Sequence, residues 1–354
     1  MAKALRLAEH GLYSTTPNPR VGCVLVRDGN VVGEGWHERA GEPHAEVLAL
    51  RVAGAMARGA TAYVTLEPCC HHGRTPPCAD ALISAGTTRV VVAMQDPNPL
   101  VAGQGITKLR TAGLTVECGL MEAAARELNI GFIARMTRGK PWLRSKIAMS
   151  LDGRTALSNG KSQWITGNAA RRDVQHWRAR SCAVLTGIGT VLADDARLNV
   201  RDIETPRQPL RVVLDSQLRI PLDAQILYGS DILVYTARDD EQKIALLQDL
   251  GVTVVVLADN RQQVDLCAML HDLAQRGCNE VLVEAGSILN GALLRAGLMD
   301  ELLFYIAPQL LGEAARSVAQ LGELTSLDQR VNLKWQDVRQ VGNDLRITVK
   351  VENV

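Results

Sequence analysis

The residues best suited to chemistry lie in three proline-containing motifs, with the sequences PHAE, EPC and PPC. These motifs contain one imidazole, that of His44, and two thiols, those of Cys69 and Cys78. Imidazole and thiolate groups are preferred zinc ligands, and three protein ligands leave the fourth position open for water, as in catalytic sites. The sequence therefore predicts a catalytic zinc site, at which the pKa of the bound water falls to about 7.

Glu46 lies two residues after His44 and is the carboxylate best placed to move a proton at this site. Residues i and i+2 do not share a face within a helix, so the two side chains can converge only at a helix start, where Pro43 places them. There Glu46 would take a proton from water and pass it to a leaving amine. The pattern is similar to the H-x-E and P-C-x-x-C motifs of zinc deaminases. It departs from them because eight residues separate Cys69 from Cys78.

Other interpretations of this cluster stay open at this point. Cys70, His71 or His72 could replace Cys69 or Cys78 as a ligand. A zinc-stabilised binding module would enclose the ion with a fourth protein ligand. A nucleic-acid or nucleoside deaminase with an accessory domain would show the shorter cysteine spacing and a basic groove. A catalytic zinc site is the main hypothesis.

The elements that must position these residues follow from the hydrophobic pattern, which alternates strands and helices and indicates an α/β fold. A hairpin of Val21–Arg27 and Val31–Trp36 precedes a helix at His44–Arg58 that would begin with the His44 motif. The other strands predicted in the first half are Ala62–Leu66, Arg89–Ala93 and Leu114–Cys118, and the other helices are Cys78–Ala85, Ile106–Ala112 and Met121–Arg138.

The segment Arg138-Gly139-Lys140-Pro141 interrupts this pattern and is typical of a helix end followed by a linker. We therefore predict two domains, residues 1–139 and 140–354, as the chain length also favours. The strands predicted in the second domain are Leu143–Met149, Cys182–Thr186, Leu210–Leu214, Ile232–Tyr235, Val252–Val256, Glu280–Glu284, Glu301–Pro308 and Leu345–Glu352. Its predicted helices are Asn168–Arg180, Glu241–Leu250, Gln263–Arg276 and Ser287–Ala296.

The composition argues against several classes of protein. The 39 Lys and Arg residues nearly balance the 38 Asp and Glu residues, and aromatic residues make up only 3% of the chain. Proteins that bind nucleic acid need clustered positive charge and stacking surfaces, so we expect no nucleic-acid partner. The sequence has no apolar run of 18 residues and no signal peptide, so we expect a cytoplasmic protein with no membrane partner.

Longer motifs in both halves make this sequence resemble the family of bifunctional riboflavin-biosynthesis deaminase/reductases. In the first half they are PNPRVG at 17–22, AGEPHAE at 40–46 and EPCCHHGRTPPC at 67–78. In the second half they are SLDGR at 150–154, SQWIT at 162–166, TVLADD at 190–195, VEAG at 283–286 and DEL at 300–302. The sequence departs from the family pattern at Cys70, where serine is usual, and it starts close to an amphipathic helix expected in its first ten residues.

The resemblance implies two consecutive reactions with two cofactors. The first half would be a cytidine-deaminase-like α/β/α sandwich with one zinc ion, deaminating a diaminopyrimidinone that carries a ribosylamino 5′-phosphate. The second half would be a dihydrofolate-reductase-like α/β domain that uses NADPH to reduce the ribosyl group of the product to ribityl. We further expect a homo-oligomer, a dimer or a tetramer, acting on a small phosphorylated pyrimidine.

Substrate contacts in the first half are expected from polar residues in the motif loops, because a phosphorylated pyrimidine needs donors and acceptors around it. These residues are Asn18, His37, His71, Arg74 and Asn98. Asn18 and Asn98 each lie between prolines and could instead only form turns. Arg74 is the candidate phosphate ligand, with a solvated loop charge as the alternative.

In the second half, Gly286–Ala292 opens a helix directly after a strand, where free N–H groups suit a phosphate, although the segment is not G-x-G-x-x-G. The resemblance assigns NADPH to Ala148, Trp164, Thr190, Gly286, Ser287, Ile288, Leu289, Asn290, Gly291 and Ala292. It assigns the substrate to Ser162, Arg178, Asp194, Leu198, Arg201 and Glu284. Arg178 and Arg201 are the phosphate candidates, because guanidinium groups bind phosphate in a bidentate manner. Asp194 could instead cap a turn, and Trp164 could be a core residue.

Overall fold

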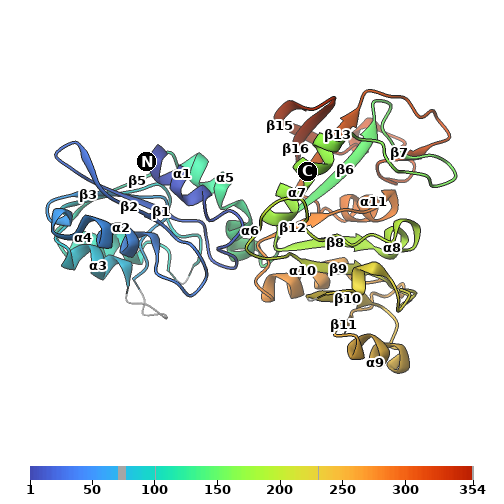
Figure 1. The fold of residues 1–354 in the computed structure, drawn as a ribbon, viewed down its shortest axis with the longest axis horizontal. Helices are drawn as coiled ribbons and strands as arrows, with labels where there is room; N and C mark the ends of the chain where they lie inside the picture. The colour runs from blue at the N-terminus through green and yellow to red at the C-terminus, as the bar shows by residue number, and fades with distance from the viewer. Residues whose placement is uncertain (71–76, 100, 230, 353–354) are drawn as a thin grey trace. The chain divides into compact units, whose positions relative to one another are not determined.

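The computed structural model describes residues 1–70, 77–99, 101–229 and 231–352. The chain forms two compact units, Met1–Lys140 and Pro141–Val354, and each is built around its own sheet (Figure 1). Among the described residues, none of the helices combines the length and the apolar character needed to cross a membrane.

The first unit is a five-stranded sheet with helices on both faces. The strand order is β2-β1-β3-β4-β5, with β1 antiparallel to β2 and β3, and with β3, β4 and β5 parallel. Helices α1 and α5 lie on one side of the sheet, and α2, α3 and α4 on the other (Figure 1). The strands are β1 (Gly22–Arg27), β2 (Asn30–Trp36), β3 (Thr61–Val64), β4 (Arg89–Val92) and β5 (Thr115–Cys118). The helices are α1 (Ala2–Glu9), α2 (Ala45–Ala53), α3 (Cys78–Ser84), α4 (Gln104–Thr111), α5 (Glu122–Leu128) and α6 (Ile130–Arg138).

Helix α2 packs closely against strand β2, and this packing fixes the position of His44 at the start of the helix. A Cβ atom added at Gly33 would lie 2.2 Å from the Ala49 carbonyl oxygen, so no larger residue fits there without moving the helix. The small side chains Ala45, Ala49 and Ala53 are all buried on the facing side of the helix. The glycine and the alanines together allow the helix backbone to contact the sheet.

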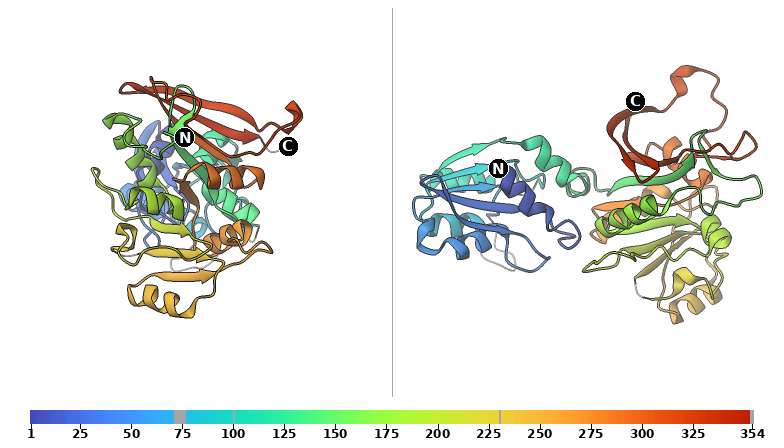
Figure 2. Two further views of the ribbon diagram at one scale, coloured as in Figure 1. Left: turned by 90° about the vertical axis from the view of Figure 1, so that its right-hand side faces the viewer. Right: turned by 45° about the horizontal axis from the view of Figure 1, so that its top comes forward.

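The second unit is a nine-stranded sheet with the order β11-β10-β9-β8-β12-β6-β13-β16-β15. The strands from β11 to β13 in this order are parallel, and β16 and β15 add an antiparallel ribbon. Both views in Figure 2 show this ribbon, in dark red, at the opposite end of the sheet from the yellow strands. The strands are β6 (Trp142–Ser150), β8 (Ala183–Gly187), β9 (Leu210–Leu214), β10 (Ile232–Thr236), β11 (Thr253–Val256), β12 (Glu280–Val283), β13 (Glu301–Ala307), β15 (Asn332–Val341) and β16 (Asp344–Glu352). Two short strands, β7 (Arg154–Ala156) and β14 (Arg316–Ser317), pair separately.

Among the described residues of this unit, five α-helices connect the strands. They are α7 (Asn168–Arg180), α8 (Ile188–Asp194), α9 (Glu241–Asp249), α10 (Leu266–Gln275) and α11 (Ser287–Arg295). Helices α8 and α11 matter most for function, because they start at the carboxyl ends of the adjacent parallel strands β8 and β12. Ligands of parallel α/β sheets bind at these strand ends.

The structure differs from the sequence-based elements at several positions, and the short strands β7 and β14 are among the elements that were not expected. The single helix expected at Met121–Arg138 is two helices, because the chain leaves the helical conformation at Asn129. The buried Asn129 side chain accepts a hydrogen bond from the Arg20 N–H (2.8 Å) and donates one to its carbonyl oxygen (2.9 Å). Helix α8 and strand β15 were not expected, since the first contains a glycine and the second is exposed along most of its length.

A buried group of charges holds the centre of the second sheet together. Arg144 on β6 is 1% exposed, and its Nε donates to Glu301 Oε1 at 2.8 Å and its Nη1 to Glu280 Oε2 at 3.1 Å. Its guanidinium group also lies 4.6 Å from the centre of the Trp177 ring. Arg180 donates to the same Glu280 oxygen at 2.7 Å. These contacts connect β6, β12, β13 and α7.

We predict that Arg144→Met destabilises the second unit by about 3–5 kcal/mol, because the Glu301 carboxylate and part of Glu280 would stay buried without a cation. Urea denaturation at neutral pH measures this change. Arg261→Met is the matched control, because Arg261 is exposed, and it should change the free energy of unfolding by less than about 0.5 kcal/mol. Equal stability of Arg144→Met and the wild type would contradict this account of the charge group.

Candidate active sites

The three residues expected to bind zinc come together in the first unit. The ligand atoms of His44, Cys69 and Cys78 all lie within 4.8 Å of one another. His44 Nδ1 is 3.2 Å from Cys78 Sγ and 3.6 Å from Cys69 Sγ. Nitrogen and sulfur ligands of a tetrahedral zinc ion are separated by about 3.6 Å, given the usual bond lengths. The donor set and its spacing therefore fit a zinc ion.

Two helix starts and one strand end produce this convergence. His44 is the N-cap of α2 and has an extended backbone, and Cys78 is the first residue of α3. Cys69 lies in the segment that follows β3, where its Sγ accepts a hydrogen bond from the Cys78 N–H at 3.3 Å. Its carbonyl oxygen accepts another from the Ala79 N–H at 3.1 Å. The hydrogen bond from Cys78 and the contact with His44 hold the pKa of the Cys69 thiol below its usual range, which favours the thiolate that a metal binds.

Glu46 lies in the first turn of α2 and is 3% exposed. Burial raises the pKa of its carboxyl group to about 7, and the nearby Cys69 thiolate adds to this effect. A carboxyl group with a pKa near neutrality can both accept and return a proton, which is the property that a general base and acid needs. The structure thus places a buried carboxyl group with a pKa near neutrality next to the candidate ligands.

Asn18 and His37, both expected to contact the substrate, are hydrogen-bonded to each other. His37 Nδ1 lies 3.2 Å from the Pro43 carbonyl oxygen, which can only accept, so this nitrogen carries the proton. The other ring nitrogen, Nε2, then accepts from Asn18 Nδ2 at 3.0 Å. Burial lowers the pKa of His37 and favours this neutral form. The chain of contacts sets the orientation of the Asn18 amide and leaves its oxygen available as an acceptor.

The other first-unit candidates are less directly placed. Asn98 lies in the loop between β4 and α4, where its N–H donates to Asp96 Oδ1 at 2.8 Å. His71 and Arg74 lie outside the described residues. The thiol of Cys70 lies 3.6 Å from Gln104 Oε1, and Cys70 does not belong to the three-residue cluster.

In the second unit, four of the six residues expected to meet the substrate form two pairs. Ser162 Oγ lies 3.4 Å from Asp194 Oδ1, at the end of α8, which also carries Thr190. Arg178 is buried, and its Nε and Nη2 donate to the two carboxylate oxygens of Glu284 at 2.5 and 3.0 Å. Although burial opposes ionisation, the charges of Arg178 and Lys146 lower the pKa of Glu284 below its usual range. Glu284 is therefore an anion throughout the physiological pH range.

Three further candidates are placed as follows. Leu198 is buried, while Arg201 is exposed and donates its backbone N–H to Gln175 Oε1 at 3.1 Å. Ala148 lies on β6, opposite Tyr305 of β13.

Trp164 is 65% exposed and is therefore not a core residue. The guanidinium group of Arg171 lies 4.5 Å from the centre of its ring, a cation–π contact that restrains the indole. An exposed and restrained aromatic ring is available to a flat ligand.

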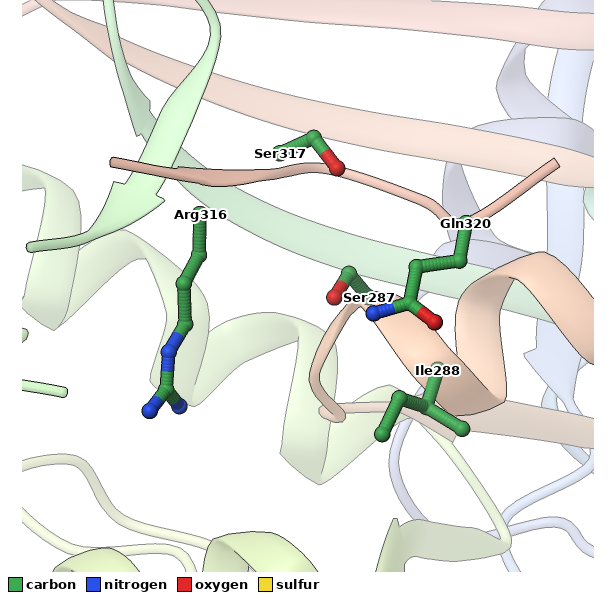
Figure 3. A pocket seen from close by; sticks show the side chains of 5 residues that line it. All are labelled: Ser287, Ile288, Arg316, Ser317 and Gln320. Carbon is green, nitrogen blue, oxygen red and sulfur yellow. The ribbon is translucent and has the colours of Figure 1, made fainter. Parts of the chain in front are cut away.

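The expected cofactor turn, Gly286–Ala292, is divided between pocket and core. Ser287 and Ile288 line a pocket of about 440 Å³ together with Arg316, Ser317 and Gln320 (Figure 3). Asn290 faces inward instead, and it is 1% exposed. Its Oδ1 accepts from Ser145 Oγ at 2.9 Å, and its Nδ2 donates to two backbone carbonyl groups. Leu289 packs against the hydrophobic core, and Gly291 lies against the backbone of Gln320.

The sequence reasoning missed three residues that the structure brings to these sites. Glu67 belongs to the EPC motif but was given no role, and Lys146 contacts Glu284 at 3.1 Å. Arg316 faces the pocket at the start of α11 (Figure 3). A signal existed only for Glu67, which lies inside a recognised motif. Lys146 and Arg316 lie far from their partners in the sequence, and no spacing rule connects them.

The fold and the site define the class of protein. A three-layer α/β unit with a His-Cys-Cys cluster and an adjacent buried glutamate is a zinc-dependent deaminase, and residues 1–94 match the cytidine and deoxycytidylate deaminase zinc-binding region. Residues 141–347 match the RibD C-terminal domain. The chain belongs to the RibD family of riboflavin biosynthesis proteins, and it is a bifunctional deaminase and reductase with zinc and NADPH as cofactors.

Relatives agree over nearly the whole chain. The Riboflavin biosynthesis protein RibD of Escherichia coli is 50% identical over 98% of this chain and 96% of its own length. The structure of Acinetobacter baumannii RibD is 50% identical, with a TM-score of 0.92 over 99% of this chain and 98% of that one. A diaminohydroxyphosphoribosylaminopyrimidine deaminase/5-amino-6-(5-phosphoribosylamino)uracil reductase from Thermotoga maritima is 32% identical, with a TM-score of 0.88 over 99% and 97% of the two chains. These matches confirm the mixed α/β fold with a deaminase unit followed by a reductase unit.

We predict that Cys69→Ala and Cys78→Ala each reduce the bound zinc well below one ion per chain, because two protein ligands hold the ion poorly. Elemental analysis of the purified protein measures the zinc content. Cys70→Ala should retain the metal, because Cys70 is a neighbouring thiol outside the cluster. Loss of zinc from Cys70→Ala, with zinc retained in Cys69→Ala, would show that the ligands are assigned wrongly.

Proposed function

We propose that residues 1–139 deaminate 2,5-diamino-6-ribosylamino-4(3H)-pyrimidinone 5′-phosphate and that residues 140–354 reduce the product, 5-amino-6-(5-phosphoribosylamino)uracil. The single observation that carries the first step is the convergence of His44, Cys69 and Cys78 beside the buried Glu46. The name of the Thermotoga maritima relative gives the same two substrates. The homo-oligomer and the cytoplasmic location stay predictions.

In the deaminase unit, His44, Cys69 and Cys78 would hold the zinc ion, which when bound supplies Lewis acidity toward a water molecule. Glu46 accepts a proton from the attacking water at its carboxylate, because its raised pKa makes it a base of suitable strength. It then returns this proton to the amino group, which leaves as ammonia. The Asn18 amide oxygen, held in place through His37, would accept a hydrogen bond from the pyrimidine edge.

The remaining first-unit contacts are proposed from their place in the motif loops. Asn98 would contact the ring, His71 would contact the substrate, and Arg74 would bind the 5′-phosphate, since a guanidinium group matches phosphate geometry. These contacts would orient the reacting carbon toward the Glu46 side of the site, and orientation alone can lower the barrier substantially.

In the reductase unit, NADPH supplies the hydride that reduces the ribosyl carbon. Asp194 and Ser162 would bind the hydroxyl groups of the sugar, and the negatively charged Glu284, which directly follows β12, would do the same. Arg201 is exposed and suits the substrate phosphate. Arg178 is buried and already donates to Glu284 and to the Asn199 carbonyl oxygen. Only its remaining N–H groups and its positive charge would be available to the substrate.

The NADPH contacts are proposed around α8 and α11, at the ends of adjacent strands. Ala148, Trp164 and Thr190 would contact the cofactor, with the exposed Trp164 ring as one wall. In the Gly286–Ala292 turn, Gly286, Ser287 and Ile288 are the residues placed to meet a ligand, whereas Leu289, Asn290, Gly291 and Ala292 would set the position of the helix. Arg316 adds positive charge to the pocket that Ser287 also lines (Figure 3).

We predict that Glu46→Gln keeps its zinc and loses deamination by about a hundredfold or more, because an amide cannot carry the proton between water and amine. The measurement is ammonia release from the diaminopyrimidinone phosphate without NADPH, followed by NADPH oxidation once it is added. In the same preparation, reduction of the deaminated intermediate should continue at the wild-type rate. Normal ammonia release from Glu46→Gln would refute the proton-transfer role, and no release from zinc-loaded wild type would refute the proposed function.

We predict that Arg316→Gln raises the Kd for NADPH by about tenfold, since a charge-assisted phosphate contact contributes about 1.5–3 kcal/mol. Titration of the purified chain by NADPH fluorescence gives the Kd independently of turnover. An equal effect on NADH would place Arg316 at the diphosphate, and an effect on NADPH alone would place it at the 2′-phosphate. Arg261→Gln, which removes an exposed arginine elsewhere in the unit, should leave both values unchanged. Unchanged NADPH binding in Arg316→Gln would remove this residue from the site.

A further inference from the structure

Glu67 is a buried carboxylate that the proton transfer does not use. It is 4% exposed, and each of its two oxygens accepts two backbone hydrogen bonds. Oε1 accepts from the N–H groups of Gly105 (2.8 Å) and Ile106 (3.1 Å), and Oε2 accepts from those of Asp96 (3.1 Å) and Gly103 (2.9 Å). One side chain therefore satisfies four N–H groups, three of which belong to the last residue before α4 and its first turn.

These four contacts fix both ends of the loop that carries Asn98. Asp96 begins the loop after β4, and Gly103 ends it at the N-cap of α4. Between them, the Asn98 carbonyl oxygen accepts from the N–H groups of Val101 and Ala102, each at 2.9 Å. Hydrogen bonds within the loop therefore hold the backbone at Asn98, and hydrogen bonds to Glu67 hold the two ends of the loop.

Glu67 also belongs to the segment that carries the candidate metal ligand Cys69. Pro68 alone separates Glu67 from Cys69, and the Glu67 N–H donates to the Met94 carbonyl oxygen at 3.0 Å. A Cβ atom added at Gly105 would lie only 2.0 Å from the Pro68 carbonyl oxygen, so the start of α4 lies directly against this segment. The loop with Asn98 and the ligand Cys69 therefore share one rigid connection.

We propose that Glu67 is a positioning residue for deamination, which holds the Asn98 loop in register with the zinc ligand Cys69. The proposal rests on the proposed function, because it takes Asn98 to contact the pyrimidine. The residue must be a carboxylate, because all four partners are donors and only a carboxylate offers four acceptor positions without a donor of its own. A glutamine of the same shape would direct its NH₂ group at one pair of N–H groups and release one end of the loop.

The test uses Glu67→Gln in the full chain and measures the steady-state constants for ammonia release. The KM for the diaminopyrimidinone phosphate should rise about tenfold, the ratio expected when a buried hydrogen-bonded pair is lost. We expect kcat to change far less, and the zinc content and the reduction of the deaminated intermediate to equal those of the wild type. A purely structural carboxylate would lower Tm and leave KM unchanged, and that result would overturn the proposal.

Two further variants make the test specific. Glu117→Gln is the matched control, since Glu117 is an exposed carboxylate on β5 that pairs with Arg89, and its KM should equal that of the wild type. Gly105→Ala keeps the Glu67 carboxylate but places a Cβ atom 2.0 Å from the Pro68 carbonyl oxygen and 3.2 Å from Glu67 Oε1, which forces the start of α4 away from this segment. It should therefore raise KM as Glu67→Gln does, even where Glu67→Gln folds poorly. A normal KM in folded Gly105→Ala would contradict the proposal.

A double-mutant cycle tests whether Glu67 acts through Asn98. Residues that act on the substrate through one another show non-additive effects. In an Asn98→Ala background, Glu67→Gln should raise KM by less than about twofold. A full tenfold rise in that background would overturn the link to Asn98. Absence of ammonia release from the zinc-loaded wild type would instead refute the proposed function itself, so the two failures are distinguishable.

Discussion

The first unit depends on one constraint: three ligand atoms from separate segments must meet within 4.8 Å. Two of these segments are helix starts, and the third follows a strand, so the geometry requires α2, α3 and β3 to end or begin at one point. Helix α2 reaches that point because Gly33 allows its backbone to contact β2. Glu46, in the first turn of the same helix, is buried, and burial raises the pKa of its carboxyl group to about 7.

The protein uses buried carboxylates in three ways, and the partners decide which. Burial, together with the nearby Cys69 thiolate, raises the pKa of the Glu46 carboxyl group to about 7, so this group can both accept and return a proton. Glu284 lies between Arg178 and Lys146, which keep it charged. Glu67 accepts four backbone N–H groups, so that it organises a loop. The residue type is the same in each case, and the surroundings determine whether it moves a proton, presents a charge or holds the backbone.

Much of the deaminase site could be predicted from local sequence, because its chemistry is concentrated in short motifs. A histidine and a glutamate at one helix start, and a cysteine at another, follow from the positions of the prolines. The reductase site was less predictable, because its residues come from strands and helices far apart in the chain. Resemblance assigned all of Gly286–Ala292 to the cofactor. The structure shows that Asn290 is a buried hydrogen-bonded residue and that Arg316, from another segment, faces the pocket. The break at Asn129 was also hidden, since it depends on the backbone of Arg20.

The sequence by itself determined the alternation of strands and helices, the division into two domains and the family, because hydrophobic periodicity and motif spacing are local properties. It also determined which residue types are available at each site. The tertiary structure decided which of them meet, through the close packing of α2 on β2, the four contacts of Glu67 and the adjacent strand ends of β8 and β12. It alone decided that the pKa of Glu46 is raised and that the pKa of Glu284 is lowered. The physical reason is that burial and distance to a charge depend on the folded chain, and neither can be read from neighbours in the sequence.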